Sequence, residues 1–321
     1  MSSAGDSFWS GYWRSLKSLE VEEPVDVFVH RPLAYVIARG LLPTRISPDA
    51  VTLTSLAFGL TAAVLMVWPL PHHWQWAALL SFIGTVLDCV DGQLARLRKT
   101  SSVLGRMLDG TCDSTVVMAA AVAAACVHVP RLGSTPLRAL LVAAVIVASA
   151  ISISVQVTLF DHYKTVFLKL TVPGYREAES IETVRQNYAQ ARQQPMSILA
   201  RILWAYYLTF VGRQGGTVRA YDPYTVIEFH KVAEYSSERA AQYRQHCQGV
   251  MRVWRYFFGF GSLMIGIALA LFFELTWEFL LLRLTLFNLV FWGPLRWWQR
   301  KASEAASLSL GLPRAGESPA N

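Results

Sequence analysis

The chain has 321 residues, of which 53% are hydrophobic and only 16% are charged. Its mean hydropathy of +0.33 is too high for an ordinary soluble domain and indicates a membrane protein. The net charge of +7 could suggest nucleic acid binding, but loops rich in Lys and Arg on one side of a bilayer give the same balance, and we favour that explanation.

The N-terminal segment, residues 1–47, is predicted to stay in the cytoplasm. Residues 1–30 lack the apolar run that a cleavable signal peptide needs. After them, Leu33, Val36 and Ile37 recur at helical spacing among arginines. This pattern predicts a short amphipathic helix on the membrane surface.

A helix start is encoded at the end of this segment. Ser47 offers a capping hydroxyl, Pro48 suits the first turn, and Asp49 places an acid at the positive end of the helix dipole. The first membrane span is therefore predicted to begin near residue 48.

Six apolar segments approach the roughly 20 helical residues that cross a bilayer core. They are residues 51–70, 74–96, 106–129, 136–160, 254–274 and 277–297. The sequence thus predicts an all-α integral membrane protein with six transmembrane helices and both termini on one side.

Basic residues predict the orientation of the bundle. The link between the second and third spans holds Arg96, Arg98, Lys99 and Arg106, and the 161–253 connection holds twelve Lys and Arg residues. The connections at the other side are nearly free of them. Because basic loops stay in the cytoplasm, we expect both termini and the second connection to be cytoplasmic. Abundant Ala and Arg suggest a bacterial inner membrane.

The connection at 161–253 reads as a helical cytoplasmic insertion. Residues 176–194 and 228–249 have amphipathic patterns, whereas 198–211 is apolar but too short to span and is expected in the interface. The insertion is either a solvated cap or a device that grips an acceptor substrate. Four spans (48–160) precede it, two (254–299) follow it, and a tail (300–321) is expected to be disordered.

Four cysteines show no metal-finger spacing, and two of them lie in a region predicted to face the cytoplasm. Disulfides are therefore not expected.

Four aspartates lie where the second and third spans meet. Residues three or four apart share a helix face, so Asp88 pairs with Asp91 and Asp109 with Asp113. The short basic turn between the spans brings these pairs face to face. Such carboxylates would repel one another strongly unless divalent cations lay among them. Oxygen ligands suit Mg²⁺ or Mn²⁺, and four acids could hold two ions.

Small and donor residues accompany the aspartates. Gly92, Ala95 and Gly105 leave room beside the carboxylates, and Arg96 and Ser102 can donate to phosphate oxygens. Small residues in membrane helices often serve only close packing, and a lone Asp can reach the interface. The joint pattern favours a diphosphate site open to the cytoplasm.

These residues reproduce the signature D-x2-D-G-x2-A-R-x8-G-x3-D-x3-D, so the chain resembles the CDP-alcohol phosphotransferase family. The motif runs from Asp88 to Asp113, and no element is missing. The six spans and the preceding surface helix also resemble the family's transmembrane domain. The family often has Pro-Asn followed by Thr at the first span, where this chain has Pro48, Asp49 and Thr52.

The resemblance implies a metal-dependent membrane enzyme of phospholipid synthesis, which joins a CDP-linked alcohol to an acceptor hydroxyl and releases CMP. It implies homodimers. By motif position, Asp88, Asp91 and Asp109 are metal ligands, and Asp113 is a ligand that also serves as the general base. The residues that would line the cytidine diphosphate site are Gly92, Ala95, Arg96, Ser102 and Gly105.

Three activities stay open at this point. The favoured donor is CDP-diacylglycerol with a small polar alcohol as acceptor. CDP-ethanolamine or CDP-choline with a lipid acceptor is the alternative, because the run SSVLGRMLDGTCDS resembles that branch. A non-catalytic protein that binds nucleotides or lipids is the third, although an idle site would have no need to keep four mutually repelling acids.

Overall fold

The computed structural model describes residues 8–16, 18–100, 102–175, 180–193, 195–232 and 235–317. Within these ranges the chain is helical and has no strand. The elements are α1 Phe8–Ser15, η1 Asp26–His30, α2 Arg31–Leu41, α3 Pro48–Val67, α4 His73–Arg98, α5 Val103–Leu132, α6 Pro136–Thr171, α7 Ile181–Ala191, α8 Ile198–Tyr221, η2 Phe229–Lys231, α9 Ser237–Phe257, α10 Phe260–Phe272, α11 Thr276–Leu282, η3 Arg283–Phe287, α12 Asn288–Val290, η4 Phe291–Leu295, α13 Arg296–Leu310 and η5 Ala315–Glu317.

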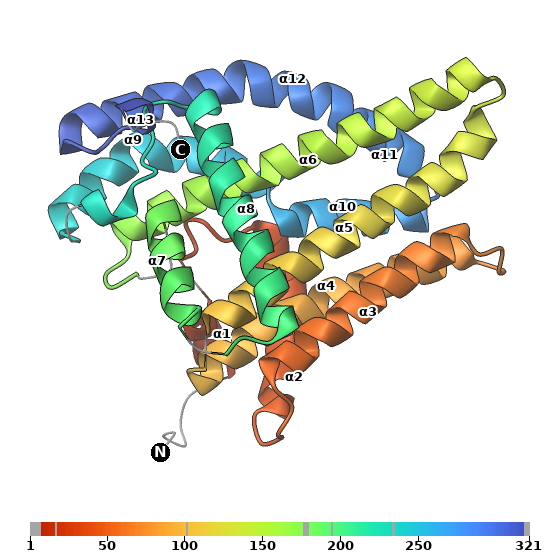
Figure 1. The fold of residues 1–321 in the computed structure, drawn as a ribbon, viewed down its shortest axis with the longest axis horizontal. Coiled ribbons are helices and arrows are strands. Elements are labelled where there is room, and N and C mark those ends of the chain that lie inside the picture. Colours follow the sequence, from red (N-terminus) through yellow and green to blue (C-terminus); the bar gives the residue numbers. More distant parts are fainter. Residues whose placement is uncertain are drawn as a thin grey trace. The chain divides into compact units, whose positions relative to one another are not determined.

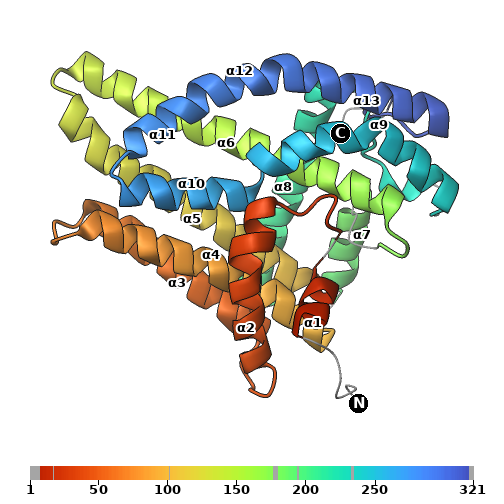
Figure 2. The same ribbon diagram turned by 180° about the vertical axis from the view of Figure 1, so that it is seen from behind.

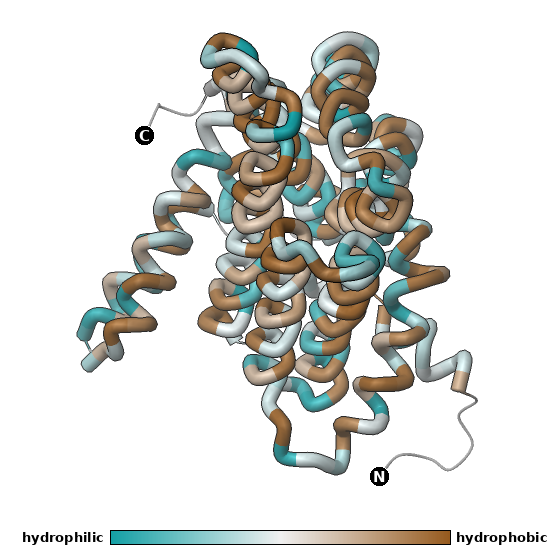
Figure 3. The backbone as a smooth tube through the Cα atoms, turned by 90° about the vertical axis from the view of Figure 1, so that its right-hand side faces the viewer, coloured by the Kyte–Doolittle hydropathy of each residue, from teal (hydrophilic) through white to brown (hydrophobic). Residues whose placement is uncertain are grey.

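Six helical stretches in the described residues are long and apolar enough to cross a membrane, which confirms the predicted number and indicates an integral membrane protein. Hydrophobic stretches cover much of the tube in Figure 3, with hydrophilic residues scattered among them. The stretches are Pro48–Val67, His73–Arg98, Val103–Leu132, Pro136–Thr171, Ser237–Phe272 and Thr276–Leu310.

The chain forms two compact units. Unit 1 consists of the described residues of Met1–Ile151 together with Phe260–Leu284, and unit 2 of those of Ser152–Gly259 together with Thr285–Asn321. The two predicted pairs of acids lie in unit 1. The predicted insertion belongs to unit 2.

Three long helices of unit 1 run side by side, with α3 packed against both α4 and α5 (Figure 1). Their core consists mostly of alanines, including Ala62, Ala78 and Ala123, which allow close helix approach. A Cβ atom on Gly59 of α3 would lie 2.6 Å from a methyl carbon of Val116 on α5. Only glycine therefore permits this separation of the two helices.

Capping residues fix the helix ends around the four aspartates. Ser47 Oγ accepts a hydrogen bond from Ala50 N at 3.1 Å, so α3 begins at residue 48 as predicted. Ser102 Oγ accepts from Gly105 N at 2.9 Å and starts α5 in the same way. Lys99, in the left-handed region with φ 57°, ends α4. The short turn between these caps makes α4 and α5 a hairpin.

The N-terminal helices belong to unit 1, where α2 packs against α4 (Figure 2). Ala34, Tyr35 and Ala38 of α2 are buried, whereas Leu33 and Val36 are exposed. The helix itself agrees with the sequence, and its position on the membrane surface stays a prediction. In α1, burial raises the pKa of Tyr12 to about 12, so its phenol remains protonated and donates to Val27 O.

Unit 2 is built around aromatic side chains, with Trp254 of α9 in contact with Tyr163 and Phe291. The structure differs from the sequence prediction at the start of the insertion, because α6 continues to Thr171 rather than ending near 160. The reason is that residues 161–171 bury one face, including Phe167 and Leu168. Parts of the predicted amphipathic helices, at 176–179, 194 and 233–234, lie outside the described residues.

The C-terminal segment also differs from the prediction, because α13 continues to Leu310. We expected disorder from residue 300, and this was wrong for residues 300–310. Ala302 and Ala306 are buried, and Trp254 Nε1 of α9 donates to Gln299 Oε1 of α13 at 2.9 Å. The small residues of this segment, which suggested a disordered tail, therefore allow α13 to pack closely. Residues 318–321 lie outside the described part.

Candidate metal and diphosphate site

Three of the four predicted aspartates converge in unit 1. Asp88 and Asp91 come from α4 and Asp109 from α5, and one carboxylate oxygen of each lies within 4.8 Å of the others. Asp91 is 6% exposed, and the other two are half-buried. The hairpin between α4 and α5 thus brings together groups that repel one another as anions.

Asp113 lies one turn beyond Asp109 on α5. Its carboxyl group interacts electrostatically with that of Asp88, and both side chains line one cavity. The structure therefore places Asp113 beside the other three acids, next to an open space.

The donor set fits a divalent cation. Every side chain in the cluster offers carboxylate oxygens, the ligands that Mg²⁺, Mn²⁺ and Ca²⁺ prefer, and their spacing within 4.8 Å is short enough to share an ion. A doubly charged cation would remove the repulsion among acids held in apolar helices.

Thr52 is a residue of the site that lies outside the aspartate motif. Its hydroxyl donates to Asp91 Oδ2, and the side chain is 4% exposed. Thr52 comes from α3, 39 residues away from Asp91. The sequence signal for Thr52 is its place in the Pro48, Asp49, Thr52 pattern at the start of the first span. Its hydroxyl holds the Asp91 carboxylate in a fixed orientation.

The residues predicted to line the diphosphate site lie at the adjoining ends of α4 and α5. A Cβ atom on Gly92 would be 3.4 Å from Arg96 Nη1, and one on Gly105 would be 3.0 Å from Ser102 Oγ. These glycines keep space open beside the predicted phosphate donors. Ala95, on the same stretch of α4, is half-buried.

Two of the predicted donors also have structural partners. Arg96 Nε donates to Ser15 O at 3.2 Å, which joins α4 to the N-terminal region, and Arg96 also acts electrostatically on Asp91. Ser102 accepts a bond as the cap of α5, while its own O–H can still donate. Asp49, in the first turn of α3, also lies near Gly105: its Oδ1 is 3.4 Å from the position of a Gly105 Cβ.

The cavity beside Asp88 and Asp113 has a wall from a helix remote in sequence. Ser55 of α3 and Thr85 of α4 line it from one side, and α10 contributes Phe260 and Met264. It therefore joins the acidic cluster to small polar and to apolar surface. All of its lining residues belong to unit 1.

The four cysteines are free. Cys89 and Cys112, the two in the acidic region, lie on α4 and α5.

Comparisons with known proteins agree with this geometry. The sequence profile of the CDP-alcohol phosphatidyltransferase family matches residues 45–214, which contain the whole aspartate motif. The chain is 32% identical over 77 residues to phosphatidylinositol phosphate synthase of Corynebacterium glutamicum, covering 24% of this chain and 34% of that protein. It is 32% identical over 93 residues to the synthase of the same name from Mycolicibacterium smegmatis, covering 27% and 41%.

A second kind of relative is also similar. Cholinephosphotransferase 1 of Danio rerio is 33% identical over 95 residues, covering 26% of this chain and 25% of that protein. The chain therefore spans between a quarter and about two fifths of the length of these relatives. The family profile covers more than half of the chain and includes every aspartate of the cluster, so the chain belongs to the CDP-alcohol phosphatidyltransferase family.

Proposed function

We propose that this protein is a phospholipid-synthesising membrane enzyme, which transfers a phosphatidyl group from CDP-diacylglycerol to the hydroxyl of a small polar alcohol and releases CMP. The observation that carries this proposal is the convergence of Asp88, Asp91 and Asp109 within 4.8 Å, in a chain of this family. The matches to phosphatidylinositol phosphate synthases support a phosphatidyl donor.

The side chains have distinct roles in this proposal. Asp88, Asp91 and Asp109 would hold the cations with help from Asp113, and we propose two ions, either Mg²⁺ or Mn²⁺. Bound there, the cations would polarise the diphosphate and offset the charge that develops on CMP. Arg96 and Ser102 donate to phosphate oxygens, while Gly92, Ala95 and Gly105 leave space for the cytidine diphosphate.

Bond making and breaking then follow from the same groups. Asp113 accepts the proton of the acceptor hydroxyl, whose oxygen attacks the phosphorus next to the transferred alcohol. The bond from that phosphorus to the bridging oxygen breaks, and CMP leaves with the electron pair. No covalent enzyme intermediate is needed, since the described residues around the site supply no activated nucleophile.

The surroundings of the site are part of the proposal. We propose a homodimer, in keeping with the family resemblance. We also propose that the active site and both termini face the cytoplasm of a bacterium. The reason is that the basic residues cluster in the connection between the second and third spans and in residues 161–253, and basic loops stay in the cytoplasm.

The alternative donors are CDP-ethanolamine and CDP-choline, with a lipid acceptor. The match to cholinephosphotransferase 1 favours this reading specifically. Purified protein should be supplied with each radiolabelled CDP donor in turn, and the lipid products separated by thin-layer chromatography. We expect product from CDP-diacylglycerol. Transfer from CDP-ethanolamine or CDP-choline, but never from CDP-diacylglycerol, would reverse this order.

Removal of the metal ions distinguishes an enzyme from a non-catalytic protein. EDTA should stop CMP release, and Mg²⁺ or Mn²⁺ should restore it, because the carboxylates bind substrate only through cations. Turnover that survives EDTA would contradict the metal assignment. No CMP release from any donor with either ion would favour a protein that only binds nucleotides or lipids.

A further inference from the structure

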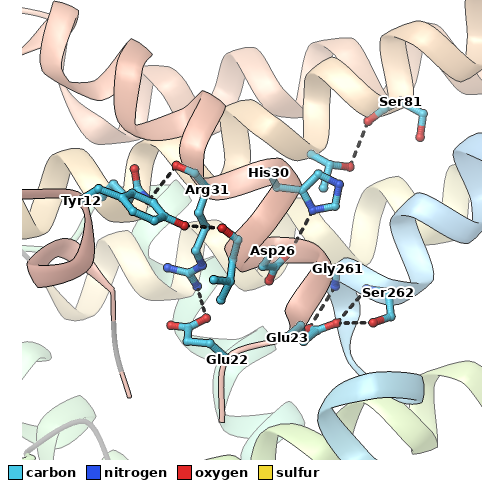
Figure 4. Close-up of polar contacts among 12 residues, drawn as sticks. Tyr12, Glu22, Glu23, Asp26, His30, Arg31, Ser81, Gly261 and Ser262 are labelled. Carbon is cyan, nitrogen blue, oxygen red and sulfur yellow. Dashed lines mark hydrogen bonds and ion pairs between the residues drawn. The ribbon is translucent and has the colours of Figure 1, made fainter. Parts of the chain in front are cut away.

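Two neighbouring glutamates before η1 are almost completely buried: Glu22 is 1% exposed and Glu23 is 4% exposed. Burying a carboxylate is costly unless it is well paired, so the partner of each is informative. Glu22 forms an ion pair with Arg31, with 2.9 Å between Glu22 Oε2 and Arg31 Nη2. Glu23 instead points toward the start of α10 (Figure 4).

Glu23 receives three hydrogen bonds from the first turn of α10. Its Oε1 accepts from Gly261 N at 3.1 Å, and its Oε2 accepts from Ser262 N at 2.7 Å and from Ser262 Oγ at 2.8 Å. The first backbone N–H groups of a helix have no partner within it, and a carboxylate there also meets the positive end of the dipole. Glu23 thus caps a helix that begins more than 230 residues later in the chain.

A close contact beside this cap fixes the start of α10 further. A Cβ atom on Gly261 would lie 2.0 Å from Asp26 Oδ1, so only glycine fits there. Asp26 is itself held by His30, whose Nδ1 is 2.8 Å from the same oxygen. The N-terminal region and the first turn of α10 are therefore matched in both shape and hydrogen bonding.

The capped turn carries one wall of the aspartate cavity. Phe260 starts α10 and Met264 lies one turn later, and both line the cavity that Asp88 and Asp113 also line. A change in the first turn of α10 would therefore move the wall that faces the proposed general base.

We propose that Glu23 is a positioning residue, which holds the first turn of α10 so that Phe260 and Met264 shape the space where the acceptor hydroxyl meets Asp113. This inference rests on the proposed function, because it takes Asp113 as the base. The CDP-linked donor is held through its diphosphate at the metal site, so displacement of α10 affects mainly the binding of the acceptor alcohol. Glu23 touches no reacting group and acts only through the helix.

The cap can be tested without any activity. Glu23→Gln keeps the volume but turns an amide N–H₂ toward the N–H donors of α10. Hydrogen exchange of the amides of Gly261 and Ser262 should become on the order of ten- to a hundredfold faster, which corresponds to losing a hydrogen bond to a charged group. The matched control is Glu22→Gln, which removes a buried charge from the same region and should leave α10 exchange unchanged.

Two outcomes of the exchange experiment would overturn the inference. One is unchanged exchange at Gly261 and Ser262 in Glu23→Gln. The other is equal acceleration in both glutamate variants, which would show general loosening of the N-terminal region. Should Glu23→Gln fail to fold, Ser262→Ala removes one of the three bonds and should give a smaller acceleration at the same amides.

Kinetics then test the consequence for the site. In Glu23→Gln the KM for the acceptor should rise about tenfold, as expected when a positioned group is displaced, while the KM for the donor and the apparent metal affinity stay within about twofold. A fall in kcat that only follows the loss of folded protein, with the acceptor KM unchanged, would overturn the positioning role. If the wild-type protein releases no CMP, the proposed function fails, and the exchange experiment still decides whether Glu23 caps α10.

Discussion

Asp113 differs from the other three aspartates in its neighbours. It lines the cavity walled by α10, which Asp88 also lines, and it lies outside the tight group formed by the carboxylates of Asp88, Asp91 and Asp109. A base needs access to the hydroxyl that it deprotonates, and a metal ligand needs to be close to the other ligands. The arrangement therefore supports separate main roles for these four acids.

Replacing Asp113 tests this division. Asp113→Asn should lower the rate of CMP release by about 10²- to 10⁴-fold, the usual contribution of a general base, without loss of the folded state in detergent. Asp161→Asn, at an exposed position of α6, is the control and should keep full activity. Full activity in Asp113→Asn would remove this residue from the mechanism.

Thr52 provides a second test at a single hydroxyl. Thr52→Val keeps the shape but removes the donor to Asp91 Oδ2, so the Mn²⁺ concentration needed for half-maximal activity should rise about 10- to 100-fold. Thr52→Ser should restore it. The control is Thr54→Val, which removes an exposed hydroxyl bonded to Ala50 O on the same helix. An unchanged metal requirement in Thr52→Val would show that this bond does not tune the site.

The residues that the sequence predicted and those that it missed differ in where their partners lie. Asp88 with Asp91, and Asp109 with Asp113, are three or four residues apart, so helical periodicity alone puts each pair on one face. Thr52 and Glu23 meet partners 39 and more than 230 residues away. The sequence pattern at the start of the first span includes Thr52, but no local pattern shows which partner either residue meets, because such contacts depend on how the helices pack.

At the scale of elements, local signals predicted the helices and the start of the first span, but not the distortions within a helix. The cap at Ser47 correctly placed the start of α3. The predicted sixth span contains two π-helical turns, at Arg283–Phe287 and Phe291–Leu295, with non-helical dihedral angles at Gly293 before Pro294. The proline removes a helical hydrogen-bond donor there, and apolar composition does not register such a distortion.

Arg98 joins two elements that bound the site. Its guanidinium donates to the carbonyl oxygens of Leu41, Leu42, Thr44 and Ile46, so the last turn of α4 ties down the connection between α2 and α3. These are the final carbonyls of α2 and the loop that follows, where cations are favourable. The start of α3, with Asp49 and Thr52, is thereby held against α4.

Removing this tie should loosen the connection. Arg98→Met keeps most of the aliphatic length and loses the donors, so the free energy of unfolding should fall by about 1–2 kcal/mol, measured by chemical denaturation in detergent. Arg138→Met, which loses only a local bond to Ser134 Oγ, is the control and should change stability little. A stability equal to that of the wild type in Arg98→Met would contradict a structural role for these bonds.

At the scale of the whole molecule, the turns between the helices of unit 1 and the positions of the basic residues together predict which side of the membrane each turn faces. The connection from α3 to α4 and that from α5 to α6 lie at one end of the helices, and the connection from α4 to α5 lies at the other (Figure 1). Arg96, Arg98 and Lys99 gather at the α4 to α5 end. The aspartates lie in the halves of α4 and α5 nearest to that same turn.

Single cysteines at the two ends test the orientation. In a variant without native cysteines, Ser134→Cys marks the α5 to α6 turn and Lys99→Cys marks the α4 to α5 turn. A maleimide that cannot cross membranes should label Ser134→Cys in intact cells and Lys99→Cys only after lysis, because basic turns are retained in the cytoplasm. The reverse pattern would place the aspartate site on the outer side. That result would contradict the proposed cytoplasmic position of the site even if the metal site were intact.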